Sequence, residues 1–272
     1  MKKYKIGSLF SGIGGFELGL ERAIPAETIW QVEQDEYCQK VLKKHWPKAR
    51  IYNDVRDINK ETVEPVDILC GGFPCQDISI AGKGEGLNGK KSGLYWEMFR
   101  IIRDLRPRVI VMENVPAITF RGGVSVIGSL ASIGYISEWT VISAGRNFGA
   151  PHLRRRWFCV SYSNCKSKSA SSRYDEALER LPSYSSSARA QTRLSEETRR
   201  EEGKAEEPYY SSHRPAGRKR ESYWAAESGI CRVVNGLPNR THRLRALGNA
   251  IVPQCSQWVG EQIWKSGILQ RE

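Results

Sequence analysis

The chain has 272 residues, seven cysteines, and 42 Lys and Arg against 30 Asp and Glu, which gives a net charge of +12. A chain of this length needs no disulfide staples, and the odd cysteine count argues against a secreted disulfide framework. The basic balance favours a polyanionic partner, and nucleic acid is the first such partner to consider.

The N-terminus MKKYKIGSLF passes directly into a strand-like run and a glycine loop, without the features of a signal peptide. No apolar run approaches the roughly 18 residues that would span a bilayer. We therefore expect a soluble, cytoplasmic protein with no membrane contact, in a reducing compartment where Cys75 persists as a thiol.

Short apolar runs alternate with amphipathic segments along the first part of the chain. The runs at 5–10, 28–33, 66–72 and 108–115 predict strands, and those at 16–24, 36–46, 94–105 and 125–134 predict helices. This alternation indicates an α/β fold with a mostly parallel sheet and helices on both faces. Two β-rich runs at 137–144 and 155–162, joined by a loop, predict an antiparallel hairpin at the sheet edge.

The composition divides the chain into three parts. Residues 1–162 are expected to form the catalytic and cofactor-binding domain. Residues 163–235, rich in Ser, Arg and Glu, are either a largely disordered insertion or a small, reduced target-recognition region. Residues 236–272 recover an apolar pattern, with Val259, Ile263 and Trp264 at helical spacing, and are expected to return to the catalytic domain.

The segment LFSGIGGFELGL predicts a strand that turns through Gly12, Gly14 and Gly15 into a helix. Glu17 occupies the third glycine position of G-x-G-x-x-G, where a carboxylate would repel phosphates and weaken a dinucleotide interpretation. Glu33 and Asp54 follow two strands and can accept hydrogen bonds from ribose hydroxyls. A nucleoside cofactor without phosphates fits this set best, although a structural glycine turn with two surface acids is the alternative.

Cys75 in GGFPCQ follows a buried strand, and three interpretations compete for it. A buried structural thiol is common, but the Gly-Gly pair and the proline indicate a loop. A metal site lacks partners, because the spacing from Cys70 is not C-x-x-C and no histidines cluster. A nucleophile on an exposed turn remains, followed by a glycine-rich lid whose Lys83 can meet an anion.

Two further clusters end neighbouring strands. The segment MENVP places Glu113 and Asn114 after an apolar run, and PHLRRRWF places Arg154 and Arg156 before a β-run. A carboxyl with a raised pKa can donate a proton, and arginine can hold a phosphate or an exocyclic oxygen. The structural alternatives are a simple Glu–Arg ion pair and a solvated arginine run.

Taken in order, these motifs resemble the DNA cytosine-5 methyltransferases, over residues 4 to about 162 and again from about 236 to 264. The resemblance rests on FSGIGGFELGL, GGFPCQ, ENV, HLRRR and GNAIVPQ. It implies a Rossmann-like, S-adenosylmethionine-dependent methyltransferase fold that uses no metal. The cofactor-site residues that it implies are Phe10, Gly12, Ile13, Gly14, Glu33, Asp54, Pro74, Asn249 and Ala250.

The resemblance also implies a mechanism in which the Cys75 thiolate attacks carbon 6 of a flipped-out cytosine. Glu113 then assists at ring nitrogen 3, while Arg156, with Arg154 nearby, holds oxygen 2 or the adjacent backbone. The expected substrate is double-stranded DNA. RNA cytosine methylation and a catalytically silent cofactor-binding or DNA-binding relic are the alternatives.

The sequence departs from this family where specificity should lie. A ninth motif is not found, and the ending CRVVNGLPNRTHRLRALGNA is similar to those of compact phage and prophage members. Lys83, Arg232, Asn235 and Arg240 are the candidates for DNA contact. We expect a monomer, since one base-flipping site needs one chain. A cognate restriction endonuclease would be a functional partner, and the sequence leaves open whether one exists.

Overall fold

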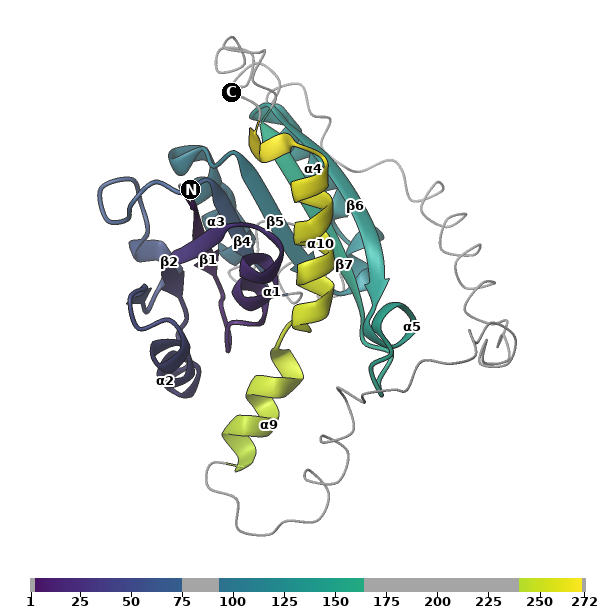
Figure 1. Ribbon diagram of the computed structural model, residues 1–272. Coiled ribbons are helices and arrows are strands. Elements are labelled where there is room, and N and C mark those ends of the chain that lie inside the picture. The colour runs from purple at the N-terminus through teal and green to yellow at the C-terminus, as the bar shows by residue number, and fades with distance from the viewer. Residues whose placement is uncertain (1–2, 75–92, 164–239, 271–272) are drawn as a thin grey trace, which may run out of the picture. The chain divides into compact units, whose positions relative to one another are not determined.

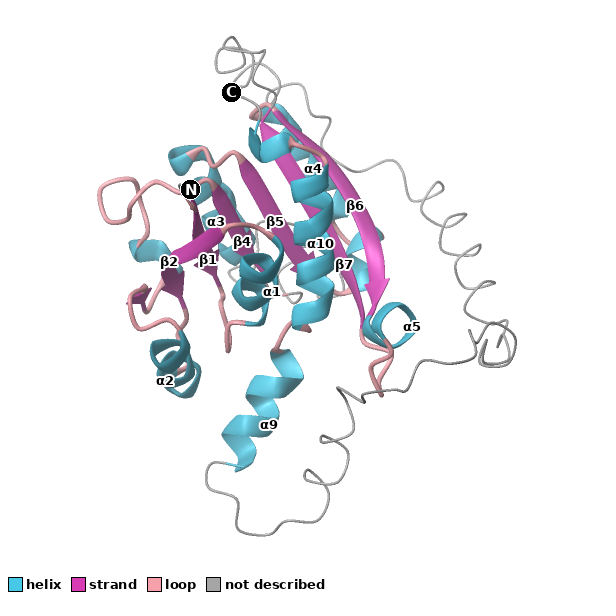
Figure 2. Cartoon of the chain, viewed as in Figure 1, coloured by secondary structure: helices cyan, strands magenta, loops and turns pink. Residues whose placement is uncertain are grey.

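The computed structural model describes residues 3–74, 93–163 and 240–270, which form a sheet flanked by helices (Figures 1 and 2). The strands are β1 (Tyr4–Leu9), β2 (Ala26–Val32), β3 (Arg50–Tyr52), β4 (Ile68–Gly71), β5 (Val109–Asn114), β6 (Tyr135–Ser143) and β7 (Arg155–Ser163). The helices are α1 (Gly15–Ala23), α2 (Glu36–His45), α3 (Gly93–Leu105), α4 (Gly123–Ser132), α5 (Ala144–Phe148), α9 (Arg240–Asn249) and α10 (Pro253–Lys265).

The seven strands lie in the order β3-β2-β1-β4-β5-β7-β6. Neighbours from β3 to β5 pair in parallel, whereas β7 pairs antiparallel with both β5 and β6. The predicted mostly parallel sheet with an antiparallel edge hairpin is therefore confirmed. Because β7 runs opposite to β5, its first residues lie at the same edge as the carboxyl end of β5.

The chain reverses its direction of travel across the sheet between β1 and β4, which are neighbours. One crossover, through α1, leads from β1 to β2, and another, through α3, leads from β4 to β5 on the opposite side. Crossovers of the same hand then place α1 and α3 on opposite faces. A switch of this kind opens a crevice at the carboxyl ends of the two central strands, where ligands bind in open α/β sheets.

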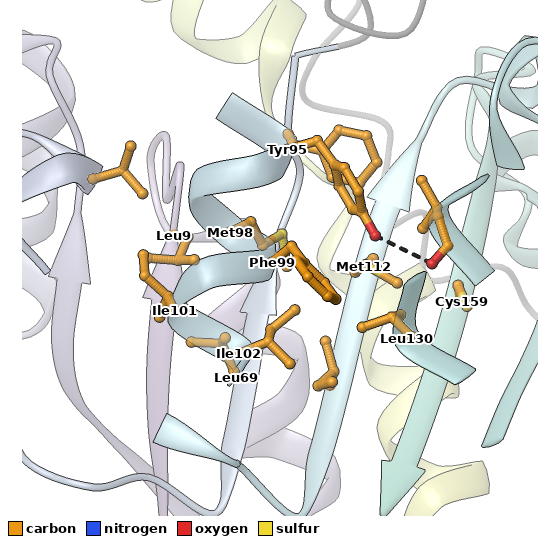
Figure 3. Close-up of a cluster of buried hydrophobic side chains, with 14 of the residues drawn as sticks. Leu9, Leu69, Tyr95, Met98, Phe99, Ile101, Ile102, Met112, Leu130 and Cys159 are labelled. Atoms are coloured by element: carbon orange, nitrogen blue, oxygen red, sulfur yellow. Dashed lines mark hydrogen bonds between the residues drawn. The ribbon is translucent and has the colours of Figure 1, made fainter. Parts of the chain in front are cut away.

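The main apolar core lies between the sheet and the helices α3 and α4 (Figure 3). Leu9, Leu69 and Met112 come from three parallel strands and are fully buried. Tyr95 on α3 packs at the upper end of this cluster, where its ring lies 5.2 Å from that of Phe73. This packing fixes the end of α3 against the loop that follows β4.

The opposite face carries α1 and α10, which pack side by side (Figure 1). Val259 and Ile263 of α10 are buried, and the Ser256 hydroxyl donates to the Gly15 carbonyl at 3.0 Å. Trp264 stays 38% exposed and contacts the Tyr4 ring edge-on, so it lies at the margin of the packed face. Helix α10 thus covers α1 and contacts the first residue of that helix, Gly15.

The structure adds helices that the sequence did not predict, among them α5 and α9. The loop expected over 146–154 includes the end of α5, which the Ser143 side chain caps by accepting from the Arg146 amide. The division at residues 163 and 235 stays a prediction, since residues 164–239 lie outside the described part. Among the helices of the described residues, none combines the length and the apolar character required to cross a bilayer.

Candidate active site

The loop after β1 turns sharply through left-handed backbone conformations. Phe10, Gly12 and Gly14 have φ values of 56°, 57° and 85°, and Gly14 is the residue that caps α1. A Cβ atom on Gly14 would lie 2.2 Å from the Trp46 ring, whereas one on Gly12 would meet nothing within 4 Å. Glycine is therefore required for packing at position 14, while Gly12 leaves open space beside the loop.

Glu33 ties this glycine loop to the end of β2. One carboxylate oxygen accepts from the Gly12 amide at 2.7 Å, and the other accepts from the Asp35 amide at 2.8 Å. Asp54, after β3, accepts from the Arg56 amide at 2.9 Å and lies 3.4 Å from the Gln34 amide nitrogen. Asp54 Oδ2 also accepts from Arg56 Nη1 at 3.3 Å. Both Glu33 oxygens and Asp54 Oδ1 accept one hydrogen bond each, so both acids can still bind hydroxyls at this edge.

Glu17 faces the protein interior. Its side chain is fully buried, and its Oε1 accepts from Gln31 Nε2 at 3.0 Å. Burial raises the pKa of this carboxyl above its usual range. The interpretation of Glu17 as a charge that repels phosphates was wrong, because the helix turns this position into the interior.

The turn after β4 is held by β5. Asn114, which is buried, donates from Nδ2 to the Phe73 carbonyl at 3.0 Å. A Cβ atom on Gly72 would lie 2.8 Å from Glu113 Oε2, so the carboxyl of Glu113 lies against this turn. Pro74 is exposed at its end. The described backbone that precedes position 75 therefore passes Glu113 at Gly72.

Glu113 and Arg156 form an ion pair in which Arg156 Nε lies 2.9 Å from Glu113 Oε1. The side chains are only 12% and 24% exposed. Burial raises the pKa of Glu113 to about 7, although Arg156 and then Arg154 lower it. Desolvation outweighs the two cations, so this carboxyl can hold a proton near neutral pH.

Arg154 makes different contacts from Arg156. Its Nη1 and Nη2 donate to the backbone carbonyls of Gly248 and Ala250, at the end of α9. Ile251 follows, and its carbonyl oxygen would lie 2.2 Å from a Cβ on Gly15. Neither Ile251 nor the Arg154 contact was predicted from the sequence, although both lie inside motifs that the sequence analysis singled out.

The predicted cofactor residues Phe10, Gly12, Ile13, Glu33 and Asp54 lie along one edge of the sheet, where β1, β2 and β3 end. Ala250 is partly buried and Asn249, the last residue of α9, is exposed. Among the described residues, no group of three His, Cys, Asp or Glu side chains could hold a metal ion.

Several predicted site residues cannot be placed. Cys75, Lys83, Arg232 and Asn235 lie outside the described residues. Arg240 begins α9, but its side chain is not among those described. Their roles stay predictions.

The model of the C-5 cytosine-specific DNA methylase family matches residues 4–233. The chain belongs to this family. The resemblance expected from the motifs is thereby confirmed. The paired Glu113 and Arg156 belong to ENV and HLRRR, two of the segments that carry the resemblance to these C-5 cytosine-specific DNA methylases.

Individual relatives agree with this family assignment. Type II methyltransferase M.Bsp6I of Bacillus sp. (strain RFL6) is 35% identical over 169 residues, which cover 59% of this chain and 52% of that protein. Type II methyltransferase M.HhaI of Haemophilus parahaemolyticus is 32% identical over 160 residues, covering 57% and 48%. The chain thus spans about half the length of the curated relatives that it matches.

A solved structure resembles the fold. It belongs to a protein assigned as a DNA modification methyltransferase encoded within an E. coli prophage, with 26% identity and a TM-score of 0.51. The similarity covers 60% of this chain and 47% of that one. It confirms the predicted methyltransferase fold.

Proposed function

We propose that this chain is a DNA cytosine-5 methyltransferase that methylates carbon 5 of a flipped-out cytosine in double-stranded DNA, through a covalent adduct with Cys75. The observation that carries the proposal is the partly buried Glu113–Arg156 pair, whose Glu113 packs against the turn that leads to position 75. Family membership and the names of the relatives, Type II methyltransferases, support DNA as the substrate and a role in restriction-modification.

The cofactor of this proposal is S-adenosylmethionine, which supplies an electrophilic methyl group when it is bound. The edge formed by the glycine loop fits such a nucleoside, because Gly12 leaves open space and the Glu33 and Asp54 carboxylates retain acceptor capacity. Phe10, Ile13 and Pro74 would complete the site, with Asn249 and Ala250 contributed by the C-terminal segment.

The residues on the base side would act on cytosine, whose carbon 5 is a poor nucleophile until a nucleophile adds to carbon 6. Cys75 would make that bond through its thiolate. Glu113 would share its proton with ring nitrogen 3 as negative charge develops there, and Arg156 would hold oxygen 2. Carbon 5 then becomes enamine-like and can accept the methyl group. Loss of its proton and elimination of Cys75 complete the cycle.

These atoms are inaccessible in a stacked duplex, so the base must leave the helix at a cost of a few kcal/mol. The glycine-rich segment with Lys83 would close over the extruded base. Arg232, Asn235 and Arg240 would contact the DNA. The proposed protein is a monomer, and a cognate restriction endonuclease would be a functional partner only.

The test is methyl transfer from labelled S-adenosylmethionine to unmethylated duplex DNA, followed by total nucleoside analysis. The wild type is compared with Cys75→Ala and with Cys38→Ala as a matched control. Cys38 is buried in α2, where burial raises its pKa to about 12, so its thiol is a poor nucleophile.

We expect 5-methylcytosine with the wild type and Cys38→Ala, and none with Cys75→Ala. Structured RNA serves as a competitor substrate, and methylation of the RNA instead of DNA would transfer the proposal to RNA. Cofactor binding without any methylated base would contradict an enzymatic role and favour a binding relic or a missing partner.

A further inference from the structure

Arg154 and Arg156 are separated by one residue at the start of β7, yet their side chains contact different parts of the molecule. Arg156 pairs with the Glu113 carboxylate at 2.9 Å. Arg154 donates instead to the Gly248 carbonyl at 2.8 Å and, through its other terminal nitrogen, to the Ala250 carbonyl. These two carbonyls flank Asn249, so one guanidinium holds the backbone on both sides of that residue.

The segment that Arg154 holds, residues 248–251, lies between the two halves of the proposed site. Toward the cofactor loop, the Ile251 carbonyl oxygen would be 2.2 Å from a Cβ on Gly15, which means that the two backbones are in direct contact. Toward the base side, Ile251 Cδ1 would be 3.8 Å from a Cβ on Gly72, the residue against which Glu113 lies. A shift of this segment would therefore be felt at both places.

The position of Arg154 carries several energetic costs. Its backbone has a φ of 29°, in the left-handed region that favours glycine. Its Nε is buried and has no hydrogen-bond partner among the described residues. Burial, and next the neighbouring charge of Arg156, lower its pKa. Costs of this kind persist when the surrounding structure requires that residue, and they cluster at functional sites.

We propose that Arg154 is a positioning residue: it clamps residues 248–251 and so sets the cofactor site, whereas Arg156 is the arginine that serves the base. This inference rests on the proposed function and changes the role expected for Arg154 from the sequence. The double contact requires a guanidinium, because its planar fork can donate to two acceptors at once, and an ammonium on a flexible stem reproduces only part of that geometry.

The experiment compares Arg154→Ala, Arg154→Lys and Arg156→Ala with Arg155→Ala, a control that removes the same charge from an exposed neighbour. Affinity for S-adenosylhomocysteine is measured by calorimetry, and methyl transfer is measured at saturating cofactor. Hydrogen exchange of residues 249–252 is followed by mass spectrometry in each variant.

We expect Arg154→Ala to weaken S-adenosylhomocysteine binding by about 10-fold to 100-fold, as the loss of hydrogen bonds from a charged donor predicts. Arg154→Lys should fall between this variant and the wild type. Exchange in residues 249–252 should rise most in Arg154→Ala, less in Arg154→Lys, and not in Arg155→Ala or Arg156→Ala. Arg156→Ala and Arg155→Ala should keep the affinity of the wild type, while Arg156→Ala loses methyl transfer even at saturating cofactor.

Unchanged affinity in Arg154→Ala together with lost transfer at saturating cofactor would overturn the inference. Arg154 would then have the role expected from the sequence, beside Arg156 at the base. Unchanged exchange in residues 249–252 would overturn it as well. If the wild type does not bind S-adenosylhomocysteine, the cofactor part of the proposed function fails. The hydrogen-exchange comparison of Arg154→Ala with Arg155→Ala then still shows whether Arg154 holds residues 248–251 in place.

Discussion

Glu113 is a carboxyl whose proton affinity is set by two opposing effects. Removal from water favours the neutral acid, and the arginines favour the anion, with a resulting pKa of about 7. Because its pKa is about 7, Glu113 is protonated at lower pH and can then donate a proton. It loses this ability as the pH rises through about 7.

We therefore expect kcat/KM for methyl transfer to decline on the alkaline side of about pH 7. Glu113→Gln should lower the rate by about 10²-fold to 10⁴-fold and should lack this alkaline limb, because an amide does not titrate. Initial rates across pH for both proteins check this. Persistence of the limb in the variant would assign it to another group.

Glu17 is a fully buried carboxyl, and its raised pKa makes the folding stability depend on pH. Because burial raises its folded-state pKa, the unfolded chain releases the proton first as the pH rises, and folding stability then falls. The loss begins above the unfolded pKa and continues toward the folded one, by about 1.4 kcal/mol per pH unit.

Glu17→Gln should remove this loss and keep a partner for the Gln31 amide group. We expect the stability of the variant, relative to wild type, to be greater at pH 7 than at pH 5. Urea unfolding of both proteins at the two pH values measures the difference. An equal difference at both values would show that Glu17 is ionised in the folded protein.

At the scale of elements, α1 and α10 approach each other through small residues. A Cβ on Gly19 would lie 2.0 Å from Ser256 Oγ and 2.4 Å from the Pro253 carbonyl oxygen. A Cβ on Gly128, which is exposed in α4, would meet nothing within 4 Å. Alanine at position 128 therefore tests helix propensity alone, whereas alanine at position 19 tests the packing of α1 against α10.

Gly128→Ala should raise the free energy of unfolding by about 0.5–1 kcal/mol, because alanine is the better helix former. Gly19→Ala should lower it by about 1–3 kcal/mol, since the backbone of Pro253 cannot yield as a side-chain tip can. Urea midpoints of the two variants test this. Stabilisation by Gly19→Ala would mean that α10 does not pack on α1 this closely.

At the scale of the whole molecule, the proposed cofactor and base residues among those described come from residues 10–156 and 249–251. A deletion of 166–206 removes none of them, so we expect it to preserve both S-adenosylhomocysteine affinity and methyl transfer. Calorimetry and bisulfite sequencing of treated DNA check the two expectations. Loss of sequence selectivity with retained transfer would instead assign recognition to the deleted stretch.

Much of this molecule follows from local patterns. The alternation of apolar runs with amphipathic segments predicted the parallel sheet, because crossover connections leave few other arrangements. The parallel arrangement in turn placed Glu33, Asp54 and Glu113 at one edge of the sheet, because the carboxyl ends of parallel strands lie together. The order of the glycine, cysteine, glutamate and arginine motifs indicated the family.

Tertiary structure decided what those side chains contact. Arg154 and Arg156 look equivalent in the run HLRRR, and only the position of residues 248–251 separates a backbone clamp from a partner of Glu113. From the sequence, Glu17 is expected to be a charge that faces a ligand, but in the fold α1 directs its side chain into the interior, toward Gln31. Motif order and periodicity are local properties of the chain, whereas burial and hydrogen-bond partners depend on segments that are distant in sequence and meet only in the folded protein.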